Sequence, residues 1–217
     1  MDRHSSLAAE QLSALDLLTA VGAGAHFYLA GGSAIAVHLS HRQSRDLDLF
    51  SESPDANLET LRTALLSRGA AVSVVAITDV TLALRVGGCP VDVVAYPYAL
   101  IDPLTEGPSR FPVAGLRDLA AMKLAAIARR GIRRDFWDLY EIVVQTSVTL
   151  PVAIRAYLAK FGAAESDIYH VVKALSYFGD AEGEPPPTGL TPSKWAAIVA
   201  YFEGAVAAKP WDRMAEG

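Results

Sequence analysis

The chain has 217 residues, 52% of them hydrophobic and 20% charged, with a formal net charge of −5. This composition predicts a folded globular protein and excludes a disordered one. The negative charge excludes a protein that binds nucleic acid through its overall charge, so an RNA contact would need a local basic patch. No apolar stretch approaches the roughly 20 residues that span a bilayer, and the N-terminus lacks the pattern of a signal peptide. We therefore expect a cytoplasmic protein with no membrane partner.

The first part of the chain alternates helix and strand patterns. Apolar residues at helical spacing predict a helix over 7–21, and a short apolar strand follows at 27–30. A Gly-Gly-Ser turn at 31–33 leads into a helix of small residues over 34–39. The next predicted strand, 46–50, reads Asp-Leu-Asp-Leu-Phe and carries two acids.

Further strands follow a predicted helix at 57–67. Alternating residues over 71–77 and 81–86 indicate two strands, and the Gly87-Gly88 pair that follows them indicates a hairpin. The run 90–96 indicates another strand, with a lone acid, Asp92, in its middle. Together these strands predict a small mixed sheet.

A proline-rich loop at 97–112 separates this sheet from a helical second half. Helical patterns occur at 116–130, 134–145, 152–160, 166–178 and 194–207, and 179–187 is expected to be a surface loop. We therefore predict an α/β (α+β) fold. The small mixed sheet lies in a domain of residues 1–110, and a helical domain occupies residues 111–217.

Asp46 and Asp48 are the first residues of the sequence that suggest a catalytic or metal-binding site. Residues at i and i+2 of a strand project from the same face, so the two carboxylates point together while Leu47 and Leu49 face a core. Two adjacent carboxylates repel each other unless a cation lies between them, and Mg²⁺ is the usual partner of such oxygen ligands. The turn at 31–33 allows a close backbone approach, and the following helix N-terminus suits an anion. This combination predicts chemistry on a nucleoside triphosphate (NTP).

The Gly-Ser turn and the later Asp-x-Asp strand resemble the signature of the polymerase-β-like nucleotidyltransferase superfamily. The sequence GGSAIAVH…RQSRDLDLF is similar to that of the AbiEii/AbiGii branch, which includes MenT-type toxins of toxin–antitoxin pairs. The resemblance covers about residues 27–143. It implies a nucleotidyltransferase core in the first domain, two Mg²⁺ ions, with Mn²⁺ as a possible substitute, and an NTP substrate.

The resemblance also implies roles for single residues. The superfamily places a third metal-binding acid on a neighbouring strand, which matches Asp92; the alternative is that Asp92 simply faces solvent on an alternating strand. Metal ligands would then be Asp46, Asp48 and Asp92. Nucleotide-binding residues would be Gly31, Gly32, Ser33, Arg45, Lys123 and Asp135. Ser44 matches a hydroxyl that is a regulatory phosphorylation site in some relatives.

Lys123 and the R-D-x-x-D-L helix at 134–139 resemble the later motifs of the same family. By that match Lys123 neutralises phosphate charge, and Asp138 or Asp135 anchors the lysine or contacts the nucleotide. Asp135 could also serve only as a cap at the helix N-terminus. Four nearby arginines suit a triphosphate or RNA backbone, or are merely solvated; they are Arg129, Arg130, Arg133 and Arg134.

The function implied is a metal-dependent nucleotidyltransferase toxin that transfers NMP from an NTP to RNA, with tRNA the favoured acceptor and a cognate antitoxin protein as a partner. Catalytic roles fall to Asp46, Asp48, Asp92, Lys123 and Asp138. Two alternatives remain open. One is an antitoxin-like enzyme that adenylylates a protein, and the other is a nucleotide-binding module without turnover.

Overall fold

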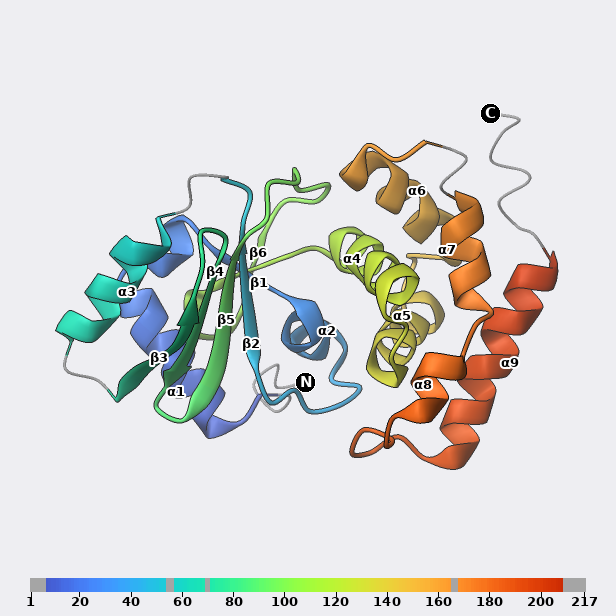
Figure 1. Cartoon of the computed structure of the whole chain (residues 1–217), viewed down its shortest axis with the longest axis horizontal. Helices are drawn as coiled ribbons and strands as arrows, with labels where there is room; N and C mark the ends of the chain where they lie inside the picture. The colour runs from blue at the N-terminus through green and yellow to red at the C-terminus, as the bar shows by residue number, and fades with distance from the viewer. Residues whose placement is uncertain (1–6, 54–56, 69–70, 165–167, 209–217) are drawn as a thin grey trace. The chain divides into compact units, whose positions relative to one another are not determined.

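The computed structural model describes residues 7–53, 57–68, 71–164 and 168–208. By internal contacts the chain divides into two compact units, Met1–Gly115 and Leu116–Gly217. The first contains a seven-stranded mixed sheet with its helices, and the described part of the second is helical (Figure 1). The predicted α/β fold class, with a mixed sheet followed by helices, is confirmed.

The first unit follows the predicted order with shifted ends. Its helices are α1 (Ala9–Ala20), α2 (Gly31–Leu39) and α3 (Leu58–Ser67), with short 3₁₀ helices at Ala23–Ala25 and Pro108–Arg110. Its strands are β1 (Tyr28–Ala30), β2 (Leu47–Ser51), β3 (Val72–Ile77), β4 (Thr81–Val86), β5 (Cys89–Ala95), β6 (Thr105–Glu106) and β7 (Pro112–Val113). In Figure 1, α2 lies beside β1 and β2, which it contacts.

The strand order is β3-β4-β5-β2-β1-β7-β6, so β2 lies at the centre of the sheet. β2 pairs antiparallel with β1 and parallel with β5. The predicted hairpin joins β4 to β5, and both of its glycines, Gly87 and Gly88, have positive φ (58° and 91°). This conformation costs glycine little, which explains their presence in the turn.

Alternate residues of the central strands form the core of the sheet. Leu47, Leu49, Leu82, Leu84, Val91 and Val93 are each at most 2% exposed. Burying one such side chain is worth about 1.5–3 kcal/mol. A one-residue slip of β2 would exchange its buried leucines for acids, so this burial fixes which face carries Asp48.

The segment 97–112 is mostly irregular, as its prolines predict, but it also contains β6 and the first residue of β7. Strand β7 pairs parallel with β1 at Leu29–Val113 and antiparallel with β6. These strands extend the sheet, so the first unit continues to Gly115, beyond the predicted boundary at residue 110.

The described helices of the second unit are α4 (Leu116–Arg129), α5 (Arg133–Gln145), α6 (Leu150–Phe161), α7 (Ile168–Leu175), α8 (Gly179–Gly183) and α9 (Pro192–Ala208). Helix α4 packs against α5, α6 and α7. Helix α8 replaces part of the predicted loop at 179–187, and the predicted start of the 166–178 helix lies outside the described residues.

Lys160 on α6 and Asp118 on α4 form an ion pair at 2.8 Å, with both side chains fully buried. This pair ties α6 to α4. Within the described ranges, no single helix is long and apolar enough to cross a membrane. The pair α5–α6, bent by 119° at its break, passes that test on length and composition alone.

Candidate active site

Gly31 lies where β1 meets α2, and only glycine fits there. Its φ is +61°, and a Cβ atom at this position would lie 2.0 Å from Oδ2 of Asp48. Ala30 is the register partner of Asp48 across the antiparallel β1–β2 pair. The Asp48 carboxylate therefore lies directly against the main chain at the start of α2.

The predicted Gly-Gly-Ser turn is the first turn of α2, because the helix begins at Gly31. The first N–H groups of a helix have no acceptors within the helix, and they attract anions. The Ser33 hydroxyl is fully buried and donates to the Ala30 carbonyl at 3.3 Å. The main-chain N–H groups of this turn are thus better suited to a phosphate than the Ser33 hydroxyl is.

Asp46 and Asp48 stand at the N-terminal end of the central strand. Asp48 lies in β2, and Asp46 is the residue immediately before the strand begins at Leu47. Both side chains are half-buried, and they alternate with the fully buried Leu47 and Leu49. Ser44 is 5% exposed, and its hydroxyl donates to Oδ1 of Asp46 at 3.0 Å. This hydroxyl therefore fixes one oxygen of the first acid.

Asp92 on β5 is the register partner of Asp48 on β2. The two strands are parallel neighbours, so the two side chains project from the same face of the sheet. Partial burial, followed by the negative charge of Asp46, raises the pKa of Asp92. The structure thus brings all three predicted metal ligands into one acidic region, in which Asp92 remains exposed.

The chemistry of this region fits a divalent cation. Carboxylate oxygens are the ligands that Mg²⁺ takes. The pKa of Asp92 is raised first by partial burial and second by the negative charge of Asp46, and a cation would relieve that second effect. The geometry is less complete, because the described residues contain no group of three His, Cys, Asp or Glu side chains arranged to hold a metal ion. The choice of Asp46, Asp48 and Asp92 as metal ligands stays a prediction.

In the second unit, Lys123 on α4 is held by two acids of α5. Its Nζ lies 2.9 Å from Oδ1 of Asp135 and 2.9 Å from Oδ2 of Asp138, and both aspartates are fully buried. Arg130 adds a second cation to Asp135, with Nε 2.9 Å from Oδ2. Both acids therefore contact the lysine, and Asp135 is more than a helix cap.

The charges of this cluster reinforce one another. Burial lowers the pKa of Lys123, but Asp138 and Asp135 outweigh it, so the net pKa is raised. Burial raises the pKa of Asp135, but Lys123 and Arg130 outweigh it, so that pKa is lowered. The lysine is thus held in its charged form. Its ammonium has three N–H donors, of which the two carboxylates take two.

The predicted arginine cluster divides into different roles. Arg130 pairs with Asp135, and the Arg133 guanidinium lies 5.3 Å from the ring centroid of Trp195. Arg129 and Arg134 are exposed. In the first unit, Arg45 is exposed next to Asp46.

Sequence reasoning missed two groups. Gln11 on α1 is 1% exposed and donates from Nε2 to the main-chain carbonyl of Asp46 at 3.0 Å. Its position, four residues before Leu15 and seven before Leu18, is on the buried face of the helix and could have flagged it. The Asp118–Lys160 pair gave no such signal, because its members are far apart in the chain.

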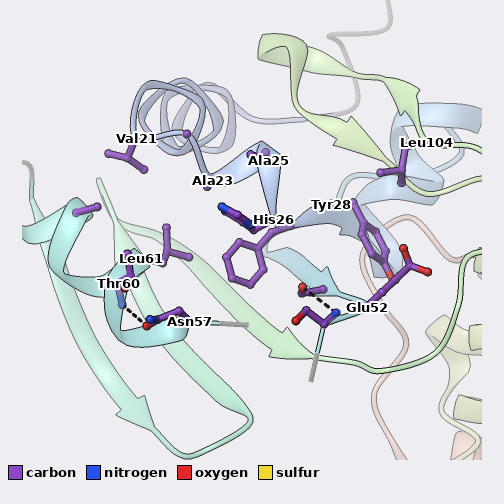
Figure 2. Close-up of a pocket in the computed structure, with 16 residues that line it drawn as sticks. Val21, Ala23, Ala25, His26, Tyr28, Glu52, Asn57, Thr60, Leu61 and Leu104 are labelled. Carbon is purple, nitrogen blue, oxygen red and sulfur yellow. Dashed lines mark hydrogen bonds between the residues drawn. The ribbon is translucent and has the colours of Figure 1, made fainter. Parts of the chain in front are cut away.

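A cavity of about 520 Å³ lies at the opposite end of β1 and β2 from the acids. Figure 2 shows Tyr28 and Glu52 on one side of it and Asn57, Thr60 and Leu61 on the other. Tyr28 begins β1, whereas Asp48 pairs with Ala30, the last residue of that strand. None of the predicted site residues is among the described residues that line this cavity.

The mixed sheet, the glycine at the start of α2 and the acids on adjacent strands are the features of a polymerase-β-like nucleotidyltransferase. Two solved structures share the fold. MenT4, a nucleotidyltransferase toxin from Mycobacterium tuberculosis H37Rv, is 19% identical with a TM-score of 0.63, covering 95% of this chain and 88% of that one. JHP933 from Helicobacter pylori is 14% identical with a TM-score of 0.53, covering 97% of each chain.

The sequence matches the family described as nucleotidyl transferase AbiEii toxin, type IV toxin–antitoxin system, over residues 14–83 and 75–216. The chain belongs to this family and is a nucleotidyltransferase. An uncharacterised protein of Aquifex aeolicus (strain VF5), aq_aa25, is 31% identical over 182 residues, which cover 81% of this chain and 84% of that protein.

Proposed function

We propose that this toxin-family enzyme transfers a nucleoside monophosphate from an NTP to an RNA acceptor, with tRNA as the first candidate, in a reaction that depends on divalent metal. The observation that carries the proposal is the convergence of Asp48, Asp92 and Asp46 beside Gly31. An acceptor oxygen attacks the α-phosphorus, a new P–O bond forms, and the bond to pyrophosphate breaks. The acceptor proton leaves to solvent.

Nucleotidyltransferases of this superfamily generally use divalent metal ions. Asp46, Asp48 and Asp92 are the residues that would hold one or two Mg²⁺ ions here. When bound, such ions neutralise phosphate charge and lower the pKa of the acceptor hydroxyl. Mn²⁺ has similar ligand preferences and is expected to substitute.

The chain's own groups supply binding and orientation. The first-turn N–H groups of α2, at Gly31, Gly32 and Ser33, would bind phosphate oxygens, and Arg45 beside the acids would add positive charge. Lys123 would use its third N–H donor for a phosphate oxygen. The charge on that donor is maintained by Asp135 and Asp138, which is how these acids would assist transfer.

The choice of RNA as the acceptor is a separate part of the proposal. The exposed Arg45 beside the acids provides local positive charge for an RNA backbone, despite the net charge of −5. The family description names a toxin–antitoxin system, so we include a cognate antitoxin protein as a partner and the cytoplasm as the place of action.

The test is incubation of the purified protein with each labelled NTP, Mg²⁺ and total tRNA. We expect label on RNA from at least one NTP. Label on protein instead would favour an adenylylating enzyme, and nucleotide binding without transfer would favour a module without turnover. Asp48→Asn is expected to abolish transfer, and Asp79→Asn, the same change in an exposed turn, is the matched control. Full transfer by Asp48→Asn would overturn the site assignment.

A further inference from the structure

Gln11 is a buried amide with both of its ends occupied. Its side chain lies on α1, where the other buried residues, Ala14, Leu15 and Leu18, are apolar. Oε1 accepts the main-chain N–H of Ala8 at 2.9 Å, and Nε2 donates to the main-chain carbonyl of Asp46 at 3.0 Å. One side chain thus joins the N-terminus of α1 to a residue 35 positions away in the chain.

The two neighbours fix the orientation of the amide. A flipped amide would set its NH₂ group against the Ala8 N–H, and its oxygen against the Asp46 carbonyl. Both contacts would then be repulsive. An apolar residue could fill the same position without the desolvation penalty of an amide. Leucine or methionine would lose both bonds, whereas glutamate could still accept the Ala8 N–H, so the bond to Asp46 is what distinguishes glutamine from glutamate here.

Asp46 needs such a contact because the sheet does not hold it. The register of β2 with β5 begins at Leu47, and its register with β1 covers Asp48 to Phe50. Asp46 lies outside both ladders, whereas Asp48 lies inside both. Of the described contacts to Asp46, the Ser44 hydroxyl donates to a carboxylate oxygen at 3.0 Å and lies 3.4 Å from the main-chain carbonyl. Gln11 donates to that same carbonyl at the shorter distance of 3.0 Å.

We propose that Gln11 is a positioning residue that sets the main chain of Asp46, so that its carboxylate acts together with Asp48 and Asp92. Gln11 does not contact the substrate and acts only through Asp46. The proposal rests on the proposed function, because it assigns Asp46 a part in transfer. It extends that function to the N-terminal helix, which lies outside the Gly-Ser and Asp-x-Asp motifs.

Three variants separate positioning from folding. Gln11→Met keeps the volume and loses both hydrogen bonds. Gln11→Glu keeps an acceptor for the Ala8 N–H but sets an oxygen against the Asp46 carbonyl. Ala8→Pro removes only the N–H that Gln11 accepts, and it suits the local backbone because the φ of Ala8 is −71°.

The first readout is transfer kinetics with NTP and Mg²⁺. A displacement of about 1 Å can reduce turnover about 100-fold. We therefore expect kcat to fall about 10- to 100-fold in Gln11→Met and at least as far in Gln11→Glu. KM for the NTP should change little, because the phosphate-binding turn of α2 is untouched. Ala8→Pro should retain the wild-type kcat.

The second readout is independent of activity. Hydrogen–deuterium exchange of the 44–47 segment should be faster in Gln11→Met than in the wild type, and unchanged in Ala8→Pro. Wild-type kcat and exchange in Gln11→Met would overturn the proposal. Equal losses in Gln11→Met and Ala8→Pro would do so too, since they would assign Gln11 to helix capping. A wild-type protein that transfers nothing would refute the proposed function, while the exchange comparison would still test the contact.

Discussion

Asp48 on β2 and Asp92 on β5 are register partners on two parallel strands, and the negative charge of Asp46 helps to raise the pKa of Asp92. Without a cation this arrangement is repulsive, because carboxylates of like charge lie on one face of the sheet. The protein therefore maintains an electrostatically unfavourable cluster, which is typical of functional sites.

Neutralising one of these acids should separate activity from stability. For Asp92→Asn we expect transfer to fall about 100-fold or more, the scale on which loss of electrostatic stabilisation acts. The unfolding temperature without metal should not fall, because a repulsive charge is removed. Thermal unfolding and transfer assays on the same preparation check both. A variant that is both active and less stable would contradict the prediction.

Gly31→Ala should damage the site through one specific clash. A left-handed φ costs a non-glycine residue about 1–2 kcal/mol, and the new Cβ would also displace the Asp48 carboxylate. Gly22→Ala is the matched control, because Gly22 has φ +76° and open space around its Cβ position. Urea unfolding should show a lower free energy of unfolding in both variants, and only Gly31→Ala should lose transfer activity. Normal transfer by Gly31→Ala would show that Asp48 can move without consequence.

Lys123→Met leaves two fully buried carboxylates without their shared cation. Breaking a buried ion pair from one side costs about 3–5 kcal/mol, so we expect a loss of that size in the free energy of unfolding. Lys160→Met removes the cation of the other buried pair and should lose a similar amount. At a temperature where both variants remain folded, Lys123→Met alone should lose transfer. Equal transfer activity in Lys123→Met and Lys160→Met would show that Lys123 has no part in transfer.

The same cluster predicts how stability depends on pH. The pKa of Asp135 is below its ordinary 3.8 in the folded protein, so its contribution is present above that value and lost as pH falls through the folded pKa. The pKa of Lys123 is above its ordinary 10.5, so its contribution is present below that value and lost as pH rises through the folded pKa. The free energies of unfolding of the wild type and Asp135→Asn in urea should therefore differ at pH 7 and converge as pH falls through the folded pKa of Asp135. A constant difference would contradict this assignment.

Strand β3 predicts an effect on self-association. It is an edge strand without charged residues, and Val75, at its irregularity, is 64% exposed. Unprotected apolar edges pair with other chains, and a lysine prevents this. Val75→Lys should lower light scattering on heating. Tyr169→Lys, at an 84% exposed helical position, is the control and should change it less.

The parts of the fold that could be predicted are those that produce a local pattern in the sequence. Alternation along 46–50 placed Leu47 and Leu49 in the core, and the paired glycines marked the turn between β4 and β5. The two-residue strands β6 and β7 are too short to have a period, and only their partners make them strands. Gln11 and Asp46 are likewise joined only by the fold, as are Asp118 and Lys160, so no local signal could pair them.

The position of β2 has a consequence for the order in which the site is assembled. Strand β2 has its parallel partner in β5, and parallel neighbours cannot be joined by a tight turn. The chain must therefore continue through α3 and the β3–β4 hairpin before Asp92 reaches Asp48. Such non-local pairing slows folding. A nascent or partly folded chain thus has not yet brought Asp92 beside Asp48, and if these acids act together as proposed, transfer can begin only after β5 has paired with β2.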